Sequence, residues 1–402
     1  MKFLRNYLNK IKPKFEEGGK LHAFRSLFDG FETFLFVPND TSKSGVNIHD
    51  AIDSKRIMSL VVIALMPALL FGMYNIGLQN AIAAGPAAVE STGWFSMFLY
   101  GLLVMLPKIA VSYIVGLGIE FTVAQWKKEE IHEGFLVSGI LIPMIVPVGC
   151  PLWIIAIATA FAVIFAKEVF GGTGMNIVNV ALIARAFIFF AYPSVISGES
   201  VWVSTESVLG LGNEIDGYTC ATALSQLSGA GVDSVVGACP ACELTTADML
   251  IGTMPGSIGE TSVIAIALGG LLLLFTGVAS WKIMVSVFVG GIAMSLFFDA
   301  TLPESNNMAH VPFWQHLILG GFCFGAVFMA TDPVTSARTE KGKYIYGFGI
   351  GAMAILIRVL NPGYPEGMML AILLMNVVAP FIDYCVVQRN VKARAKRVTK
   401  KN

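Results

Sequence analysis

Residues 57–76 read Ile57-Met-Ser-Leu-Val-Val-Ile-Ala-Leu-Met-Pro-Ala-Leu-Leu-Phe-Gly-Met-Tyr-Asn-Ile76 and contain no charged side chain. An apolar helix of about 20 residues is long enough to cross the hydrocarbon core of a bilayer. Only 13% of the residues in the chain are charged and 55% are hydrophobic, whereas soluble domains carry about 25% charged residues. The sequence therefore predicts an all-α polytopic membrane protein. Comparable stretches predict about ten transmembrane helices, near residues 57–76, 97–124, 134–148, 152–170, 179–195, 262–278, 282–299, 313–331, 346–360 and 368–387.

The basic residues of the loops alternate along the chain. Loops 77–96, 149–151, 196–260, 300–312 and 361–367 contain no Lys or Arg. Basic residues fall instead in both termini, at Lys127-Lys128, at Lys282 where the seventh span begins, and at Arg338, Lys341 and Lys343. Because basic loops stay in the cytoplasm, we expect both termini there and loop 196–260 outside. This divides the chain into a cytoplasmic segment 1–55, a membrane domain 56–387 and a basic tail 388–402. The first 55 residues hold no apolar stretch of signal-peptide type, so the first span is expected to direct insertion.

An amphipathic helix is predicted within residues 22–36, where apolar side chains recur at helical spacing on one face. Such a helix lies at the cytoplasmic membrane interface or docks on a soluble partner subunit, and the residues leave both alternatives open. The basic tail is expected to anchor the topology beside anionic lipid. No basic and aromatic surface indicates a nucleic-acid partner. The apolar face of the helix predicted within residues 22–36 consists of Phe24, Leu27, Phe28, Phe31 and Leu35.

One close cysteine pair, Cys239-Pro-Ala-Cys242, lies in the loop that is expected outside. Such a pair serves as a redox dithiol, as half of a metal site or as a local disulfide. No second cysteine pair or histidine cluster stands nearby, so an oxidising compartment favours the disulfide. Cys220 is a competing partner, which leaves the pairing open.

Two glycine- or proline-broken stretches interrupt the apolar spans, at residues 168–179 and 330–336. Non-helical backbone at membrane depth persists where it is buried in protein or lines a cavity. The two stretches are therefore candidate binding sites, with accidental helix breaks as the alternative. A weak echo between Glu133-Gly-Phe-Leu136 and Glu366-Gly-Met-Met-Leu370, which lie on opposite predicted faces, indicates two inverted repeats.

Nearly the whole chain resembles the B subunit of the sodium-translocating NADH:quinone oxidoreductases, respiratory complexes of bacteria. The motifs that carry this resemblance are specific as a set, whereas a Ser/Thr-x-Ala-Thr tetrapeptide alone would recur by chance. They are Asp53-Ser-Lys-Arg-Ile-Met58, Lys167-Glu-Val-Phe-Gly-Gly-Thr-Gly174, Ala184-Arg-Ala-Phe187 with Phe189-Phe-Ala-Tyr-Pro193, Asp216-Gly-Tyr-Thr-Cys-Ala-Thr222, Pro255-Gly-Ser-Ile-Gly-Glu260, Phe328-Met-Ala-Thr-Asp-Pro333 and Arg358-Val-Leu-Asn-Pro-Gly-Tyr-Pro-Glu-Gly-Met-Met369.

The resemblance implies a fold similar to the urea and ammonium channels, with a covalent flavin outside the membrane. FMN would be joined through a phosphoester to the hydroxyl of Thr222, the last residue of the motif that begins at Asp216. The family motif usually has Gly where this chain has Cys220, a departure that matters if a left-handed backbone is needed there. As an alternative, Thr222 is simply a helix N-cap.

The resemblance also implies a second, noncovalent flavin, riboflavin, at Asn176 and Asn179. Amide side chains suit a flavin ring because they supply both hydrogen-bond donors and acceptors. The alternative is that the two asparagines cap broken helix ends.

Quinone and sodium sites follow from the same resemblance. Quinone contacts are implied at Gly116, Glu120, Phe24 and Asp29, and Leu117 replaces one of two adjacent family glycines. Carboxylates suit Na⁺, a hard cation, and an ionisable group within a membrane span is a functional candidate. The alternative for each acid is a structural salt bridge, with Lys108, Lys167 or Arg358 as the countercharge. The implied sodium path contains Glu120, Asp332 and Asp383.

The function implied is that of a membrane subunit in the bacterial inner membrane, which passes electrons to quinone coupled to Na⁺ translocation. Its partners would be the other subunits of the complex, ubiquinone or menaquinone, Na⁺, membrane lipid and a flavin transferase for maturation. The five histidines are scattered, and no metal site, catalytic triad or dinucleotide fold is recognised, so we do not expect the chain alone to oxidise NADH. Two alternatives are the D subunit of the Rnf complex, disfavoured by the extension of about 55 N-terminal residues, and a flavin-free solute channel of urea-transporter type.

Overall fold

The computed structural model describes residues 54–127, 134–197, 201–230, 245–303, 305–361 and 366–399, with residues 7–8, 10–14 and 28 near the amino terminus. The predicted helix 22–36, except for Phe28, lies outside these residues, as does the cysteine pair. The residues of the sequence-based interpretation concerned are Phe24, Leu27, Asp29, Phe31, Leu35, Cys239 and Cys242. The described part consists of helices and connecting loops, and its only β-type pairing is an isolated bridge between Val208 and Leu211. The predicted all-α class is thereby confirmed.

Six of the described helices are long and apolar enough to cross a membrane. Three more, α6, α8 and α12, are apolar but contain only 10, 12 and 13 residues. The predicted count of ten spans and the inverted repeats therefore stay predictions. The helices are α3 (Ser54–Ala84), α4 (Pro86–Ser91), α5 (Trp94–Lys127), α6 (Phe135–Met144), α7 (Leu152–Ala162), α8 (Val180–Ala191), α9 (Pro193–Ser197), α10 (Ala223–Ala230), α11 (Thr246–Ile251), α12 (Val263–Phe275), α13 (Trp281–Thr301), α14 (Phe313–Ile318), α15 (Phe322–Phe324), α16 (Glu340–Leu360) and α17 (Met368–Thr399).

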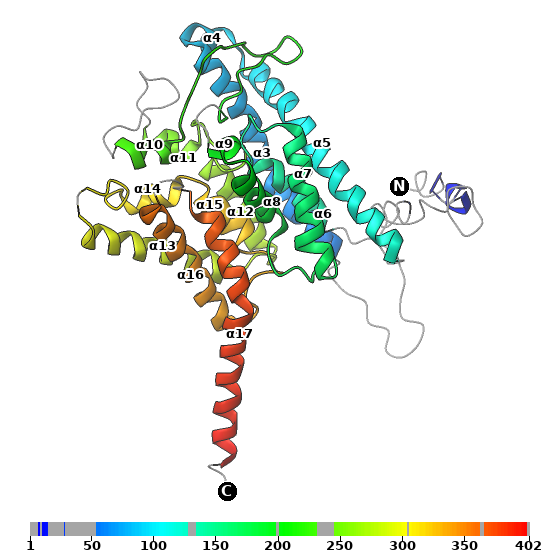
Figure 1. Cartoon of the computed structure of the whole chain (residues 1–402), viewed down its shortest axis with the longest axis vertical. Helices are drawn as coiled ribbons and strands as arrows, with labels where there is room; N and C mark the ends of the chain where they lie inside the picture. Colours follow the sequence, from blue (N-terminus) through cyan, green and yellow to red (C-terminus); the bar gives the residue numbers. More distant parts are fainter. Residues whose placement is uncertain are drawn as a thin grey trace.

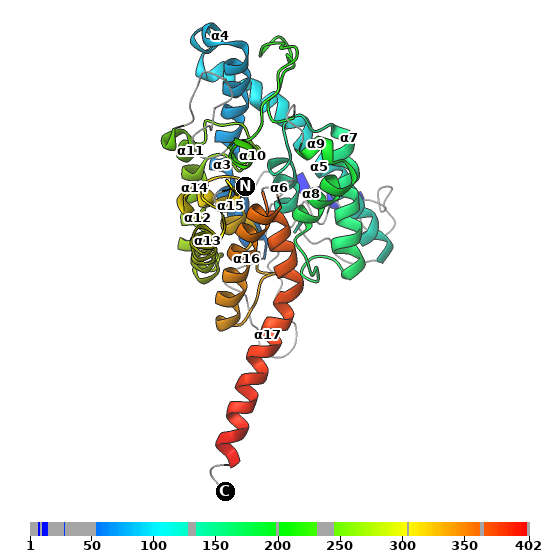
Figure 2. The same cartoon turned by 60° about the vertical axis from the view of Figure 1, so that its left-hand side comes forward.

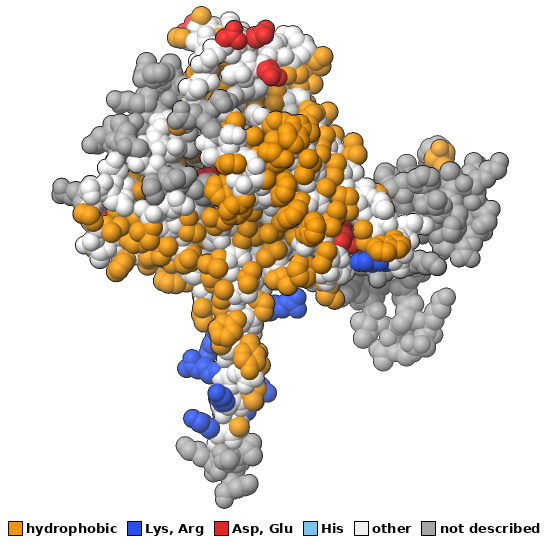
Figure 3. All heavy atoms as spheres, viewed as in Figure 1, with side chains coloured by type: hydrophobic (Ala, Val, Ile, Leu, Met, Phe, Trp, Pro, Cys, Tyr) orange, Lys and Arg blue, Asp and Glu red, His pale blue; other side chains and the backbone are white. Residues whose placement is uncertain are grey.

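The outer surface explains why this chain needs a bilayer. Large apolar side chains such as Ile114, Phe190 and Phe275 are exposed, and Figure 3 shows a broad apolar band across the face in view. Acidic side chains gather above this band and basic side chains lie below it on the protruding helix, while acidic and basic side chains lie side by side at the lower right edge. Such a band is far larger than the apolar patches of soluble monomers. Which side of the membrane is cytoplasmic stays a prediction from the loop charges.

Glycines allow the long helices to approach closely. A Cβ on Gly101 of α5 would lie 1.8 Å from the carbonyl oxygen of Met73 on α3, and one on Gly351 of α16 would lie 2.0 Å from that of Val287 on α13. Membrane helices pack through such small residues because lipid supplies no hydrophobic force between them. These glycines fix the pairing of α3 with α5 and of α13 with α16.

The last helix, α17, begins within the body and continues far beyond it. Figures 1 and 2 show it leaving the other helices at the carboxyl-terminal end, opposite to α4. Its apolar first part carries Met369 and Ile372 in the core, whereas its last turns carry exposed basic residues.

Candidate functional site

A π-helical turn directly precedes each of the two broken stretches, residues 168–179 and 330–336, that the sequence analysis identified. After α7 the chain forms a π-helical turn over Val163–Lys167, and after α15 it forms another over Gly325–Met329. Short π-helical segments are rare and concentrate at functional sites. Both turns lead into a single pocket, because Lys167 of the first and Phe328 of the second both line it.

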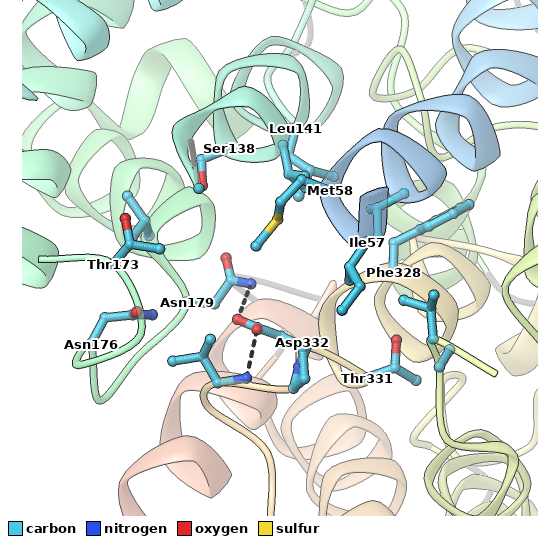
Figure 4. A pocket seen from close by; sticks show the side chains of 18 of the residues that line it. Ile57, Met58, Ser138, Leu141, Thr173, Asn176, Asn179, Phe328, Thr331 and Asp332 are labelled. Atoms are coloured by element: carbon cyan, nitrogen blue, oxygen red, sulfur yellow. Dashed lines mark hydrogen bonds between the residues drawn. The ribbon is translucent and has the colours of Figure 1, made fainter. Parts of the chain in front are cut away.

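This pocket, which we call the central pocket, has a volume of about 810 Å³ when the space open to solvent is included. Its walls come mainly from α3, α6 and the two broken stretches, and Figure 4 shows Met58, Leu141 and Phe328 around it. Apolar walls with few polar groups are typical of sites for cofactors and other small molecules. The polar lining residues are Ser138, Lys167, Thr173, Asn176, Asn179, Thr331 and Asp332.

Asn179 and Asp332 join the two broken stretches across the pocket. Asn179 Nδ2 donates to Asp332 Oδ2 at 3.3 Å, while its Oδ1 accepts the backbone N–H groups of Ala181 and Leu182 as the N-cap of α8. Asp332 also accepts the backbone N–H of Val334 at 3.0 Å and the Thr335 hydroxyl at 3.1 Å. Figure 4 shows the hydrogen bond between Asn179 and Asp332. The alternative that Asn179 caps a broken helix is therefore correct, and only part of its amide is left for a ligand.

Asn176 and Thr173 leave polar atoms for a ligand. Asn176 Nδ2 donates to the carbonyl of Val178 at 3.1 Å, and the described residues supply no donor to its Oδ1. The Thr173 hydroxyl is buried without a hydrogen-bond partner among the described residues. A buried polar atom without a partner costs about 1–3 kcal/mol, so these atoms suit a bound molecule with polar edges. A flavin, which has an apolar ring and polar edges, fits this donor and acceptor set.

Glu120 forms a buried ion pair with Lys167, and both side chains are 5% exposed. The pair links α5 to the rim of the central pocket, as the salt-bridge alternative anticipated. Gly116 lies one turn away, where a Cβ would lie 1.9 Å from the ring of Phe135. Gly116 is thus covered by an aromatic side chain, and Leu117, the departure from the family pattern, is a partly buried packing residue.

Asp383 lies away from the pocket, on α17. It accepts the backbone N–H of Arg338 at 2.8 Å and the backbone N–H and hydroxyl of Thr339 at 3.0 and 2.5 Å. The Thr339 hydroxyl in turn caps α16, because its Oγ1 accepts the backbone N–H of Gly342. Asp383 therefore holds the start of α16, and the structure brings Asp332, but not Asp383, together with Asn176 and Asn179.

Thr222 lies at the start of α10 and is partly exposed. Its Oγ1 accepts the backbone N–H of Ser225 at 3.3 Å, so the N-cap alternative also holds as a structural role. Among the described residues other than glycine, only Leu209 has a positive φ. Cys220 therefore sits in an ordinary backbone conformation and is buried beside Tyr218, so its replacement of the family glycine introduces no strain.

Two buried arginines near the Thr222 region were not assigned as site residues from the sequence. Arg185 of α8 bridges Glu260 and Glu366, with 2.7 Å from Nη1 to Glu260 Oε1. Arg358 of α16 is fully buried and donates to four backbone carbonyls, those of His316, Leu319, Gly320 and Glu366. Their position within apolar helices was the available signal, because buried charges in membranes are rare and paired.

These arginines connect to Thr222 through a smaller cavity of about 350 Å³. It is lined by Thr222, Glu260, Gly320 and Glu366 among others. A Cβ on Gly320 would lie 2.4 Å from Leu224 Cδ2, so α10 packs directly on the turn that Arg358 holds. We call Arg185, Arg358 and their partners the arginine network. The position of Thr222 thus depends on this network.

Comparison with known proteins gives a family for this arrangement. The model of the NQR2, RnfD, RnfE family matches residues 41–392. A relative from Chromohalobacter salexigens, named as the B subunit of Na(+)-translocating NADH-quinone reductase, is 43% identical over 98% of this chain and 96% of its own length. Relatives of the same name from Klebsiella pneumoniae and Neisseria meningitidis are each 42% identical over 98% of this chain and 99% of their own length. The resemblance read from the motifs is confirmed, and the chain belongs to the NQR2, RnfD, RnfE family.

Proposed function

We propose that this chain is the B subunit of a bacterial Na⁺-translocating NADH:quinone oxidoreductase in the inner membrane. It would carry FMN covalently at Thr222 and riboflavin in the central pocket, and pass electrons to ubiquinone or menaquinone coupled to Na⁺ movement. The observation that carries the proposal is the near full-length similarity to relatives of that name. Flavins supply one- and two-electron chemistry, while the protein supplies orientation and electrostatics.

The surroundings of Thr222 support an ester to a phosphate group. Its hydroxyl is at the N-cap of α10, where backbone N–H groups and the helix dipole stabilise an anion. Partial exposure leaves the hydroxyl accessible to a flavin transferase before the complex assembles. Loop 201–216 packs against α3 and α5 through Asn80 and Tyr100, which keeps the covalent site close to the membrane domain.

The central pocket supports a noncovalent flavin. Thr173 and Asn176 would meet the polar edges of the ring, while apolar residues such as Leu141 and Phe328 would cover its faces. Lys167 is held by Glu120, so its charge is balanced before a ligand binds.

The carboxylates support a role in ion movement. The described residues place no Lys or Arg within ion-pair distance of Asp332, whose three hydrogen bonds come from Asn179, Val334 and Thr335. An acceptor-only carboxylate of this kind favours Na⁺ nearby. Glu120 is paired with Lys167, so it would contribute to the sodium path or to quinone only when that pair opens.

Two alternatives remain, one from the same family and one from another class of membrane protein. The Rnf D subunit shares the family model, but the relatives matched over 98% of this chain are named for the Na⁺-translocating NADH-quinone reductase. A flavin-free channel of urea-transporter type would need neither Thr222 nor a ligand for Thr173 and Asn176. Flavin content separates the channel from both redox subunits.

The covalent site is tested by in-gel ultraviolet fluorescence of the denatured chain, co-expressed with a flavin transferase and the remaining subunits. We expect a fluorescent band in the wild type that is lost in Thr222→Ala. Thr219→Ala is the matched control, because Thr219 is exposed in the same loop, and it keeps its fluorescence. A dark wild-type band, with a transferase that modifies a known substrate, would refute the covalent flavin.

The noncovalent site is tested on the purified complex by acid extraction and chromatography of released flavin. Asn176→Leu removes the free amide oxygen and is expected to lower the released riboflavin per complex at least about fivefold, the cost of one lost hydrogen bond, with the covalent band unchanged. Asn306→Leu is the control, because Asn306 lies in a loop remote in sequence from the pocket and donates to the Val359 carbonyl. Equal riboflavin in the two variants would contradict the assignment.

A further inference from the structure

A second, larger cleft lies where the turn between α12 and α13 meets the residues that begin α16. Its volume is about 900 Å³ when the space open to solvent is included, and it is formed by residues 277–283 on one side and by residues from Thr331 to Lys343 on the other. None of the described residues assigned to flavin, quinone or sodium lines it. We call it the headgroup cleft, and its charged and hydroxyl lining residues are Ser280, Lys282, Ser336, Arg338, Glu340 and Lys343, together with Thr331.

The lining carries an excess of positive charge. Lys282 and Lys343 both pair with the single carboxylate of Glu340, with 2.7 Å from Lys343 Nζ to Oε1. The side chain of Arg338 is exposed, and the described residues place no carboxylate within ion-pair distance of it. Asp383 lies behind the lining, accepts the backbone N–H of Arg338 and lowers this excess without cancelling it. The cleft therefore attracts an anion.

The start of α13 adds hydrogen-bond donors. Its N-cap residue, Ser280, makes no side-chain capping hydrogen bond, whereas Ser262 caps the preceding helix through the N–H of Ala265. The first N–H groups of a long helix need a partner, and an anion supplies one. The Ser280 and Ser336 hydroxyls line the same space.

Aromatic side chains place the cleft at the level of the lipid headgroups. Trp281 is 54% exposed and Tyr344 is 42% exposed, and Lys282 Nζ lies 5.8 Å and 6.0 Å from their ring centroids. Exposed Trp and Tyr concentrate at the membrane–water interface. Basic pockets between membrane helices on the cytoplasmic side bind anionic lipid headgroups.

An apolar track leads from the cleft into the membrane. On α13, Val285 and Val289 follow Trp281 at four-residue spacing and are 49% and 50% exposed, and on the adjoining α16 Phe348 follows Tyr344 in the same way. Residues four apart share a helix face. Gly290 of α13 packs against the backbone of Phe348, so the two exposed rows run side by side. A soluble anion would need no such track, whereas two acyl chains would.

We propose that the headgroup cleft binds an anionic phospholipid, with its phosphate near Arg338 and the start of α13 and its acyl chains along Val285, Val289 and Phe348. The cleft shares Thr331 and Pro333 with the central pocket. A bound lipid would therefore brace one wall of that pocket from the cytoplasmic side.

The test uses the purified complex in detergent and phosphatidylglycerol with brominated acyl chains, which quench nearby tryptophans. The chain has six Trp residues, so Trp281→Phe identifies the signal from the cleft. We expect a saturable quenching component in the wild type that is absent in Trp281→Phe. Arg338→Gln is expected to shift its midpoint roughly five- to tenfold to higher lipid concentration, whereas Arg338→Lys keeps the wild-type midpoint.

Controls separate this site from other sources of binding. Arg394→Gln removes a basic residue from the exposed tail and should leave the midpoint unchanged. Brominated phosphatidylcholine should give no saturable component. An unchanged midpoint in Arg338→Gln, or equal quenching by phosphatidylcholine, would overturn the proposal. Loss of the component with millimolar inorganic phosphate would overturn the lipid assignment in favour of a free-anion site. Arg338 makes its structural hydrogen bond through its backbone, so the variant is expected to fold.

Discussion

Replacement of Arg358 by lysine tests whether the buried arginine network holds the base of the Thr222 region. Arg358 is fully buried, and its guanidinium donates to the carbonyls of Glu366, Leu319 and Gly320 at 3.1, 2.9 and 3.0 Å and also to that of His316. Lysine keeps the charge but has one ammonium group, which cannot meet four carbonyls spread over a planar fork. We expect it to satisfy two of them.

The magnitude follows from the two hydrogen bonds that are lost. A hydrogen bond to a charged group contributes about 1.5–3 kcal/mol, so the free energy of unfolding should fall by about 3–6 kcal/mol. For a domain of this size about 1 kcal/mol lowers the unfolding temperature by roughly 2 °C, which gives a decrease on the order of 6–12 °C. The Leu224 contact with Gly320 should loosen as well, and covalent flavin at Thr222 should decrease.

The assay is thermal unfolding of the purified complex in detergent, followed by a thiol-reactive dye and by in-gel flavin fluorescence. Arg394→Lys, in the exposed tail, serves as the control and should unfold within about 1 °C of the wild type because exposed charges contribute little. If Arg358→Lys also unfolds within about 1 °C of the wild type, the carbonyls do not depend on the guanidinium, and the argument for the network fails.

Three further substitutions probe packing, the buried ion pair and the central pocket. Gly351→Val would place a side chain 2.0 Å from the carbonyl of Val287 and should destabilise the α13 and α16 pair by at least about 3 kcal/mol, measured as loss of assembled complex. Glu120→Gln leaves Lys167 buried without its partner and should cost about 3–5 kcal/mol in thermal unfolding. Asn179→Ala removes the cap of α8 and a donor to Asp332, so it should cost about 1 kcal/mol and lower the riboflavin extracted from the complex.

Matched substitutions show whether these effects have the stated causes. Gly118→Val, at a glycine with open space around it, should assemble normally. Glu168→Gln breaks the longer and more exposed pair with Lys127 and should change unfolding by less than about 1 kcal/mol. Asn179→Ser keeps an N-cap oxygen but lacks the amide donor, so it should retain stability and still lose riboflavin. A loss of assembly in Gly118→Val, or a loss of stability in Glu168→Gln or Asn179→Ser equal to that of its test variant, would contradict the corresponding cause.

The membrane fold was predictable from the sequence because segments that cross lipid must be long, apolar and almost free of charged residues. Long runs such as residues 57–76 have one physical solution, a helix with its backbone hydrogen bonds satisfied internally. The short helices α6, α8 and α12 were less predictable, since a hydropathy pattern does not distinguish a full span from a half-span that ends in a buried break. The π-helical turn at Val163–Lys167 left no sequence signal beyond the glycines that follow it.

The site residues were predictable where a family motif overlaps one of the two broken stretches, residues 168–179 and 330–336. Asn179 and Asp332 were selected from separate broken stretches, and the structure joins them by a hydrogen bond. The arrangement around Arg185 and Arg358 was not predictable, because most of their partners, such as Glu260, His316 and Leu319, are distant in sequence. Arg358 was expected to face an acid but mainly donates to backbone carbonyls, a role that residue type alone does not reveal.

Because α17 is one continuous helix, its exposed end moves as a rigid body with the part that is packed in the membrane domain. From Asp383 to Thr399 the helix continues without a break, and at 1.5 Å per residue this is an arm of about 24 Å. At the base of this arm, Asp383 accepts the backbone N–H groups of Arg338 and Thr339, which precede α16. A partner that grips the tail therefore moves the start of α16, and a tilt of about 10° displaces the end of the arm by about 4 Å. A load on the carboxyl-terminal end therefore reaches the membrane domain through Asp383 and through the packing of α17 on α16 and α8.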